Sequence, residues 1–167
     1  MRQGVRRQAE RKPGDTCALA VRRPVGPGQQ HVGLDGSVAS DFQELLGMDF
    51  AEASGDRVVI TCKVRPELHQ PYGILHGGVY CSLVESAASI GGALWLGDEG
   101  NVVGVANTTN FIRATREGNL TATATPLQRG RTQQLWQVEV TDDNGRLVAH
   151  GQVRLANLRT ADNLGKA

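Results

Sequence analysis

The fold class of this chain follows from residues 76–97, HGGVYCSLVESAASIGGALWLG. No proline interrupts residues 79–96, so the sequence predicts a helix of about five turns over Val79–Leu96, which Gly97 ends. Glycine, alanine and serine crowd its second half, where they weaken an isolated helix but let another surface approach the backbone closely. We therefore expect one long apolar helix that another element wraps.

Strand-like segments fill most of the remaining sequence. Before the long helix, Asp41 as cap and Glu44 three positions later predict a short helix that ends at Gly47. An alternating strand over Arg57–Arg65 follows it. Four more strands are predicted after the long helix: Asn101–Arg113, Gly118–Gln128, Thr132–Asp142 and Arg146–Leu158. The sequence DDNG at residues 142–145 is typical of a hairpin turn. This order predicts an α+β domain whose long helix lies on one face of a curved antiparallel sheet.

Length and composition suit one domain with short extensions. The chain has 167 residues, 40% of them apolar, which is enough for a core of ordinary size. We place the domain at residues 37–160, with a tail at 161–167. Residues 1–36 form a leader that is basic and ends in a run rich in proline and glycine, and we expect it to be disordered.

The leader carries no signal for export. It lacks the long apolar stretch of a secretory signal or membrane helix, and a mitochondrial presequence is disfavoured because serine is absent before Ser37 and Glu10 and Asp15 interrupt the basic residues. An Arg-rich tail can bind nucleic acid but is more often a solvated appendage, so nucleic-acid binding is not expected. Three cysteines without a C-x-x-C pair fit a reducing compartment, which predicts a cytoplasmic protein with no membrane partner.

Two features of the long helix point to chemistry. Its start, His76-Gly77-Gly78, presents backbone N–H groups where the helix dipole favours negative charge. Phosphate loops usually carry Lys, Ser or Thr beside such glycines, so polarisation of a carbonyl oxygen by the Gly77 N–H is the better prediction. Further along, Glu85 is a carboxylate on an apolar helix, with Ser89 one turn beyond it, and burial of an unpaired carboxylate needs a reason. Glu85 and Ser89 are therefore a candidate acid–base or nucleophilic unit.

Spacing separates these two features, and it leaves some alternatives open. Gly77 and Glu85 are eight residues apart, about 12 Å along a helix, so one site can use both only if two subunits of a symmetric dimer share it. Glu85 as a purely structural carboxylate at a subunit interface stays open. Cys81 is expected to pack as a small apolar residue, and His76 either caps the loop or donates to a substrate. His69, His76 and Glu85 lack a clear metal-ligand spacing, so no metal is expected.

These residues resemble the motif of a known family, the hotdog-fold acyl-CoA thioesterases of the PaaI type. The residues that carry the resemblance are Gln70, His76-Gly77-Gly78, Glu85 and Ser89. The similarity is greatest to the branch that contains the 4-hydroxybenzoyl-CoA thioesterase and the proofreading thioesterase of enterobactin synthesis, and it runs from about Phe42 to Leu158. It implies a long central helix wrapped by a curved antiparallel sheet, a homodimer whose sheets join and whose active sites straddle the interface, and a homotetramer built from two dimers.

The resemblance also implies a role for each residue. The Gly77 N–H would polarise the thioester carbonyl, while Gln70 and His76 help to hold the thioester. Glu85 of the facing subunit would act as base or nucleophile, and Ser89 would position the carboxylate or the water. The candidate contacts to the CoA phosphates are Arg113, Arg116, Arg129 and Arg131. No cofactor is implied, because the CoA moiety is part of the substrate.

The acyl group and the rival functions follow from the same resemblance. An aromatic acyl-CoA is the first expectation and a medium- or long-chain acyl-CoA the second. The residues expected to line the acyl tunnel are Tyr80, Leu83, Val84 and Trp95. A hotdog hydratase or dehydratase is the nearest enzymatic alternative, and an acyl-CoA-sensing protein is the alternative without catalysis. A sensor would lack a catalytic carboxylate and carry a helix-turn-helix, whereas this chain keeps Glu85.

Overall fold

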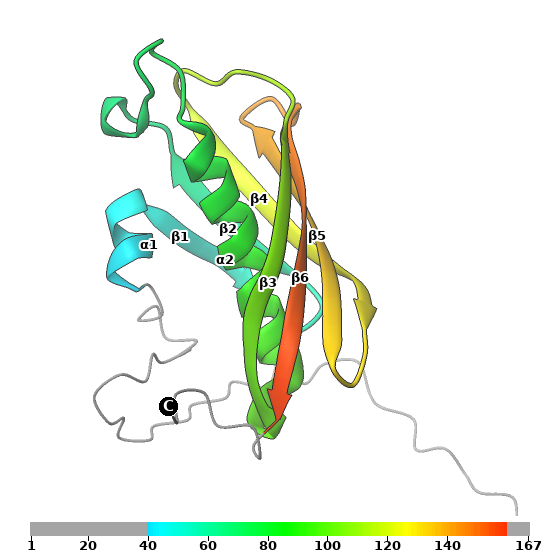
Figure 1. Cartoon of the computed structure of the whole chain (residues 1–167). Helices are drawn as coiled ribbons and strands as arrows, with labels where there is room; N and C mark the ends of the chain where they lie inside the picture. The colour runs from blue at the N-terminus through cyan, green and yellow to red at the C-terminus, as the bar shows by residue number, and fades with distance from the viewer. Residues whose placement is uncertain (1–39, 160–167) are drawn as a thin grey trace, which may run out of the picture.

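The computed structural model describes residues 40–159, so the predicted leader and tail lie outside the described residues. Two α-helices and six strands follow one another along the chain (Figure 1). The elements are α1 (Asp41–Leu46), β1 (Met48–Ala53), β2 (Val58–Lys63), α2 (Gly77–Leu96), β3 (Gly100–Phe111), β4 (Asn119–Arg129), β5 (Gln133–Asp142) and β6 (Leu147–Arg159). Two 3-10 turns, η1 (Pro66–Leu68) and η2 (Gly97–Glu99), flank the region of α2.

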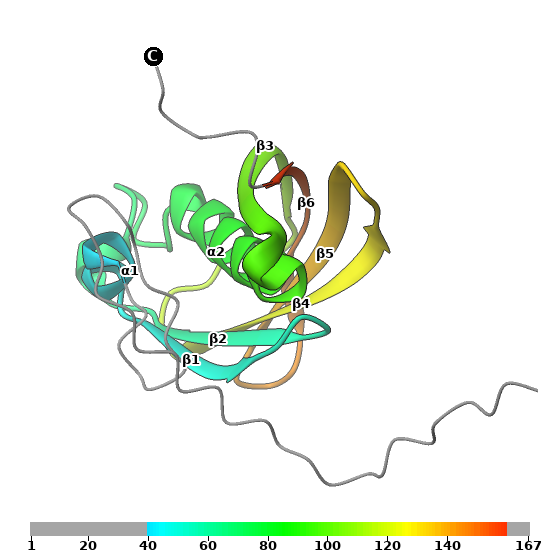
Figure 2. The same cartoon turned by 90° about the horizontal axis from the view of Figure 1, so that it is seen from below.

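The predicted long helix is confirmed and begins two residues earlier than expected. His76 is the N-cap of α2: its ring Nδ1 accepts a hydrogen bond from the Gly78 N–H at 2.9 Å, which makes Gly77 the first helical residue. Gly97, with φ of 58°, ends the helix as predicted. Residues 77–99 are long and apolar enough to cross a membrane, with a mean hydropathy of 1.3, but the sheet wraps α2 as the core helix of the domain (Figure 2).

The sheet is antiparallel and curls around α2. Its strand order is β1-β2-β4-β5-β6-β3, so β1 and β3 are the two edges. Figure 2 shows α2 in the concave side of this sheet, with α1 beyond β1. The five predicted strands are confirmed within a few residues at each end, and Gly145, with φ of 71°, closes the predicted hairpin turn between β5 and β6. The α+β hotdog architecture is therefore confirmed.

Two details at the start of the domain differ from the prediction. The cap of α1 is Ser40 rather than Asp41: the Ser40 hydroxyl accepts from the Gln43 N–H, and the Gln43 side chain accepts from the Ser40 N–H at 2.9 Å. Edge strand β1 was not predicted. A bulge between Phe50 and Glu52 interrupts the alternation of apolar and polar residues by which a strand is recognised.

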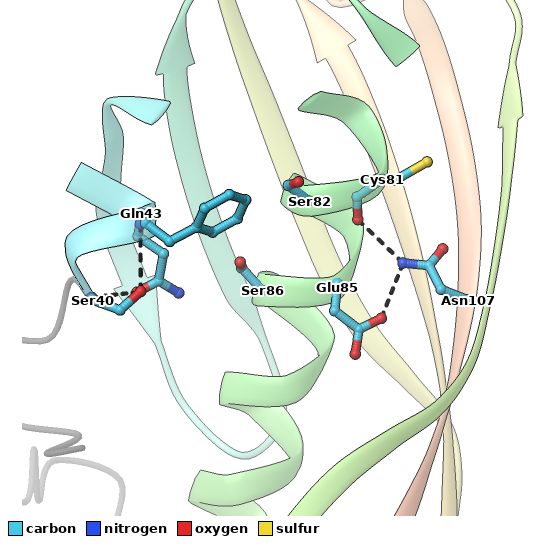
Figure 3. Close-up of a pocket in the computed structure, with 8 residues that line it drawn as sticks. Ser40, Gln43, Cys81, Ser82, Glu85, Ser86 and Asn107 are labelled. Carbon is cyan, nitrogen blue, oxygen red and sulfur yellow. Dashed lines mark hydrogen bonds between the residues drawn. The ribbon is translucent and has the colours of Figure 1, made fainter. Parts of the chain in front are cut away.

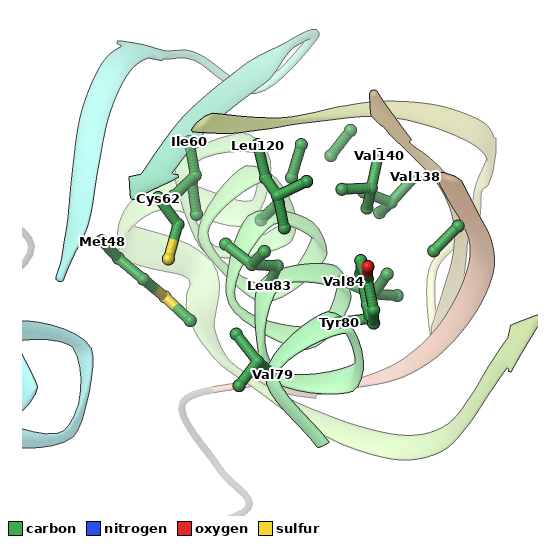
Figure 4. Packing of buried hydrophobic residues seen from close by; sticks show 14 of the residues in the cluster. Met48, Ile60, Cys62, Val79, Tyr80, Leu83, Val84, Leu120, Val138 and Val140 are labelled. Carbon is green, nitrogen blue, oxygen red and sulfur yellow. The ribbon is translucent and has the colours of Figure 1, made fainter. Parts of the chain in front are cut away.

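The apolar core lies between α2 and the concave face of the sheet (Figure 4). One face of α2 contributes four completely buried residues: Leu83, Val84, Ala87 and Ala88. The facing strands contribute fully buried side chains that include Ile60, Leu120, Val138 and Val140. Burial of this face holds α2 in one rotational position, and that position decides which residues of α2 point away from the core.

A buried polar network fastens the second half of α2 to the sheet. Trp136 Nε1 donates to Gln134 Oε1 at 2.8 Å, and Gln134 Nε2 donates to the Gly92 carbonyl at 3.2 Å and to Asn157 Oδ1 at 2.8 Å. No buried side-chain nitrogen or oxygen in residues 40–159 lacks a partner. Gly91 packs its bare Cα against the Trp136 ring, which confirms that the small residues of α2 serve close packing.

Candidate active site

Glu85 lies on the face of α2 that turns away from the core, toward edge strand β3. Its carboxylate is half-buried, and neither oxygen is unpaired: Oε1 accepts from the Ser89 hydroxyl at 3.2 Å and Oε2 accepts from Asn107 Nδ2 at 3.0 Å (Figure 3). The cost of burying an unpaired carboxylate is therefore avoided in the single chain, because both oxygens have donors. The expected proximity of Ser89 to Glu85 is confirmed as geometry.

A bulge in β3 makes room for this carboxylate. The register with β6 shifts between Gly104 and Ala106, so Val105 is an extra residue. Before the bulge Gly104 faces α2, and a Cβ there would overlap Glu85 Oε1. After the bulge it is Asn107 that faces α2. A glycine at the point of contact thus lets the carboxylate lie directly against the backbone of β3.

The start of α2 supplies a second polar feature. The Gly78 N–H is occupied by His76 Nδ1, whereas the Gly77 N–H has no acceptor within residues 40–159. His76 therefore caps its own helix through Nδ1, which is one of the two roles that the sequence left open for it. The ring of Phe111 lies over Gly77, 2.9 Å from where a Cβ would be, and close to the Tyr80 ring at 5.9 Å between centroids. The free N–H therefore sits beside an apolar wall at a helix N-terminus, where the dipole favours an oxyanion.

Gln70 lies in the turn that leads into this helix start. Its backbone N–H donates to the Ile74 carbonyl and its carbonyl accepts from the Gly73 N–H, both at 2.9 Å. Arg116 Nη1 donates to the Gly73 carbonyl at 3.1 Å and braces the same turn. Gln70 is therefore held in the neighbourhood of His76 and Gly77.

One chain does not bring all the predicted residues together. Glu85 and Ser89 form one group midway along α2, while Gln70, His76 and Gly77 form another at its start, eight residues or about 12 Å from Glu85 along the helix. The pocket beside Glu85 does not include the second group. The single chain therefore holds two separate groups of predicted site residues, here called the half-sites.

The pocket beside Glu85 is an open hollow of about 390 Å³ between α1, α2 and β3 (Figure 3). It is lined by Ser40, Phe42, Gln43, Cys81, Ser82, Glu85, Ser86 and Asn107. The residues expected to line an acyl tunnel do not line this pocket, because Leu83 and Val84 are completely buried against the sheet and Trp95 lies near the far end of α2. Tyr80, Leu83 and Val84 belong to the apolar core of the single chain, and the predicted acyl tunnel stays a prediction.

The four candidate arginines lie in different places, and Arg131 is exposed in the turn between β4 and β5. Arg113 and Arg116 follow β3 and are exposed at the end of the molecule where α2 begins. Arg129 lies near the other end of α2: it donates to the Gly55 carbonyl at 2.6 Å, pairs with Asp56 at 2.8 Å and places its guanidinium 5.5 Å from the Trp95 ring. The structure therefore does not gather the four side chains around one phosphate group within a chain.

The remaining reactive groups have structural environments. Burial raises the pKa of the Cys62 thiol, which donates to the Leu46 carbonyl at 3.3 Å. Burial likewise raises the pKa of Tyr80, whose hydroxyl donates to Thr115 Oγ1 at 2.9 Å. Cys81 is a free, half-buried cysteine at the edge of the pocket. No group of three or more potential metal ligands occurs in the part of the chain that the structure describes.

Comparison with known proteins connects this geometry to a family. The solved structure of AziG from S. sahachiroi aligns with a TM-score of 0.71 at 53% identity and covers 72% of this chain and 98% of AziG. A protein of Mycobacterium tuberculosis (strain ATCC 25618 / H37Rv), provisionally named an esterase, is 49% identical over 125 residues, which is 73% of this chain and 89% of the relative. The model of the thioesterase superfamily matches residues 72–149. This chain belongs to the thioesterase superfamily.

A thioesterase of this superfamily with a named substrate is also similar to the chain. The 1,4-dihydroxy-2-naphthoyl-CoA hydrolase of Escherichia coli (strain K12) is 35% identical over 113 residues, 68% of this chain and 83% of the relative. The resemblance to hotdog thioesterases is confirmed, and so is the prediction that the chain is a thioester hydrolase at the level of the superfamily. The matched range includes the helix start, Glu85 and Ser89, while Gln70 lies just before it.

Sequence reasoning missed three residues of this candidate site. Asn107 and Gly104 contact Glu85, and Phe111 lies over Gly77. All three are on β3, where alternation alone gives no single helix-facing register because the bulge changes the face. A glycine inside an otherwise regular strand, Gly104, was the one sequence signal of a bulge or close approach.

Proposed function

We propose that this protein hydrolyses an acyl-CoA thioester to the free acid and CoA, at a site that two subunits build together. The observation that carries the proposal is the Glu85 carboxylate, hydrogen-bonded at both oxygens and open to a pocket, on the same helix whose start holds a free N–H. A thioester is an activated acyl group with a good leaving group, so one carboxylate and one oxyanion site suffice.

The free edge of β3 supports a homodimer. Within the part of the chain that the structure describes, this strand of twelve residues pairs with β6 on one side only, and it contains no charged residue and no proline. Long uncharged edges of this kind are normally covered by another strand. Pairing of two β3 edges joins the sheets and brings Glu85 of one subunit toward the helix start of the other, because a two-fold contact is made twice. A tetramer of two such dimers is the assembly we propose.

In this proposed site the chemistry is divided between the subunits. The Gly77 N–H and the dipole of α2 polarise the thioester carbonyl and accept the charge of the oxyanion, while Gln70 and His76 hold the thioester. Glu85 of the partner subunit takes the proton of a water as that water attacks the carbonyl carbon, or attacks the carbon itself to form an anhydride that water then hydrolyses. The C–S bond breaks, CoA leaves as the thiolate and the acyl group leaves as the acid.

The lining of the pocket favours an aromatic acyl group that carries hydroxyls. Three serine hydroxyls and the Gln43 amide line it beside the ring of Phe42. A long aliphatic chain in the pocket would offer these polar groups no hydrogen-bond partner, whereas hydroxyls on an aromatic ring would hydrogen-bond with them. The similarity to a relative named a 1,4-dihydroxy-2-naphthoyl-CoA hydrolase supports the same class. Medium- and long-chain acyl-CoA is the second class.

The remaining features of the proposal concern the rest of the substrate and its location. Arg113 and Arg116, exposed beside the helix start, are the proposed contacts to the CoA phosphates, ahead of Arg129 and Arg131. The reaction needs no cofactor in this scheme. We propose a cytoplasmic location, in line with the free thiols of Cys62 and Cys81.

Free-thiol release from a panel of acyl-CoA substrates tests the proposal. The panel contains benzoyl-, 4-hydroxybenzoyl-, 1,4-dihydroxy-2-naphthoyl-, hexanoyl- and palmitoyl-CoA. The parent is expected to turn over the hydroxylated aromatic members fastest, and Glu85→Gln, which keeps the shape but removes the charge, to lower kcat about a hundredfold or more. Glu139→Gln, at an exposed position of β5, is the matched control and should leave kcat unchanged. If every substrate stays intact, acyl-CoA binding without hydrolysis becomes the better function. If the parent is active and Glu85→Gln matches it, hydrolysis does not depend on Glu85 and this carboxylate is structural.

A further inference from the structure

We propose that Asn107 is a positioning residue for catalysis, whose side-chain amide fixes the Glu85 carboxylate in its reactive orientation. This inference rests on the proposed function. Asn107 lies on β3, and its amide reaches across to α2 (Figure 3).

The amide nitrogen of Asn107 bridges two consecutive turns of α2. Nδ2 donates to Glu85 Oε2 at 3.0 Å and to the Cys81 carbonyl at 3.1 Å. Cys81 and Glu85 are four residues apart, so one NH₂ group spans the face of the helix that lines the pocket. The bond to the Cys81 carbonyl anchors the amide, and the second hydrogen then points at the carboxylate.

A second hydrogen bond fixes which way the amide faces. The Thr109 hydroxyl donates to Asn107 Oδ1 at 2.7 Å. In the flipped orientation Oδ1 would face the Glu85 carboxylate and the Cys81 carbonyl, which are both acceptors. The neighbours of Asn107 therefore permit one orientation of the amide, the one that donates to Glu85.

The bulge in β3 directs Asn107 to this place. Val102 packs against the core and Gly104 faces Glu85, so even-numbered residues face α2 before the bulge. After Val105, the side chains that contact α2 are odd-numbered: Asn107 bonds to it and Phe111 covers Gly77. If Val105 were paired regularly instead of bulged, Ala106 would take the inward position, and Glu85 would lose the donor. Bulges commonly re-aim side chains in this way beside active sites.

Together with Ser89, Asn107 holds the carboxylate by neutral donors only. None of the ion pairs among residues 40–159 includes Glu85. Two neutral hydrogen bonds fix the plane of the carboxylate without cancelling its charge, which is what a base or nucleophile requires.

Kinetics of three variants in the full-length protein, on the best substrate of the panel, test the inference. Asn107→Ala removes the donor, and a loss of about tenfold to a hundredfold in kcat is expected with less than about threefold change in KM. Asn107→Asp has the same shape but sets an acceptor against Glu85, and it should lose more. Thr109→Val keeps the donor but frees the amide, so its loss should be smaller. Asn107 is exposed in the single chain, and we expect the melting temperature to stay within about 3 °C of the parent.

A double-variant cycle separates positioning from a structural role. If Asn107 acts through Glu85, adding Asn107→Ala to Glu85→Gln causes no further loss in kcat. Equal kcat in Asn107→Ala and the parent, or a full additive loss in the double variant, would overturn the inference while the thioesterase proposal stands. If the parent protein hydrolyses no substrate, the proposed function and the role of Asn107 both fail. If the parent is active but Glu85→Gln is equally active, the proposed catalytic role of Glu85 fails, and the role of Asn107 fails with it.

Discussion

For the individual residues, the proposed chemistry depends on how the Glu85 carboxylate is held. Glu85 has a hydroxyl donor on its own helix, an amide donor on β3 and a glycine backbone against which it lies. These contacts come from two elements, so the orientation of the carboxylate depends on the tertiary fold. The charge remains open to the pocket, where a substrate carbonyl or a water can approach.

A substitution at Gly77 can remove the predicted oxyanion donor without breaking the helix. Gly77 is the first residue of α2, where proline is tolerated, and His76 has φ of −66° and ψ of 134°, which suits a residue before proline. Gly77→Pro deletes the N–H and should lower kcat about a hundredfold. Gly77→Ala keeps the N–H and is the control: it moves only the exposed Phe111 ring and should stay within about tenfold of the parent. Circular dichroism checks that α2 is retained, and equal losses in both variants would contradict the role of the N–H.

Among the helices and strands, α2 has two roles: it carries residues of the candidate site and it packs closely on the sheet. The middle of α2 carries Glu85 and Ser89, while the glycines at 91 and 92 in its second half lower helix propensity but bring its backbone close to the sheet. The buried hydrogen bonds of Gln134 lock that half in place. These hydrogen bonds fix the position of α2 on the sheet and therefore the position of Glu85 beside the pocket.

Gly91→Ala tests the packing of α2. Alanine favours an isolated helix by about 1 kcal/mol over glycine. Here the new Cβ would lie 2.6 Å from the buried Trp136 ring, so we expect a net destabilisation of about 1–3 kcal/mol, measured by urea unfolding. Gly91→Ala in combination with Trp136→Phe should recover part of the loss. An unchanged or higher unfolding free energy would show that the ring can move aside.

The turn between β5 and β6 predicts a dependence of stability on pH. The Arg146 guanidinium, 2.8 Å from the carboxylate, lowers the pKa of Asp142 below its ordinary value of about 4. A carboxyl whose pKa is lowered by folding stabilises the folded state above its unfolded pKa, and this contribution is lost as pH falls through the folded pKa. The difference in unfolding free energy between the parent and Arg146→Ala should therefore be largest at pH 5–7 and shrink below about pH 4.

Urea unfolding at pH 7, 5 and 3 measures this difference. Arg154→Ala removes an equal charge from an exposed position on β6 that has no ion pair among residues 40–159, so it serves as the control. If the difference in unfolding free energy between the parent and Arg146→Ala stays constant down to pH 3, the ionised Asp142 carboxylate is not its source.

At the scale of the whole molecule, the separation of the two half-sites is the central feature. The Gly77 N–H and the Glu85 carboxylate are about 12 Å apart along α2, and no strand among residues 40–159 pairs with the outer, uncharged edge of β3. One structural event, the pairing of two β3 edges, would cover the edge and complete both sites. Assembly and activity are then linked, and dilution below the dimer dissociation constant should abolish turnover.

Mixing two inactive variants tests the shared site. Glu85→Gln damages one half-site and Gly77→Pro the other. When the two chains are co-expressed in equal amounts, half of the dimers are mixed, and one of their two sites is intact. Activity should therefore recover to about a quarter of the parent, measured by thiol release. A mixture as inactive as its components would mean that each site is completed within one chain.

Sequence alone determined the parts of this protein that depend on local pattern. The proline-free apolar run, its small residues and the alternating segments after it were sufficient for a wrapped helix and a curved antiparallel sheet. Spacing along one helix was also sufficient to pair Glu85 with Ser89 and to separate both from Gly77, because helical geometry is regular.

Which face of each element meets the site depends on tertiary contacts that local pattern does not reveal. Burial of Leu83 and Val84 turns Ser82, Glu85 and Ser86 toward the pocket, and alternation could not choose between these faces because the helix is apolar nearly throughout. The bulge at Val105 shifts β3 by one residue and so brings Asn107 rather than Ala106 to the carboxylate. A strand repeats every two residues, so one extra residue exchanges its two faces, and that exchange is set by pairing with a distant strand.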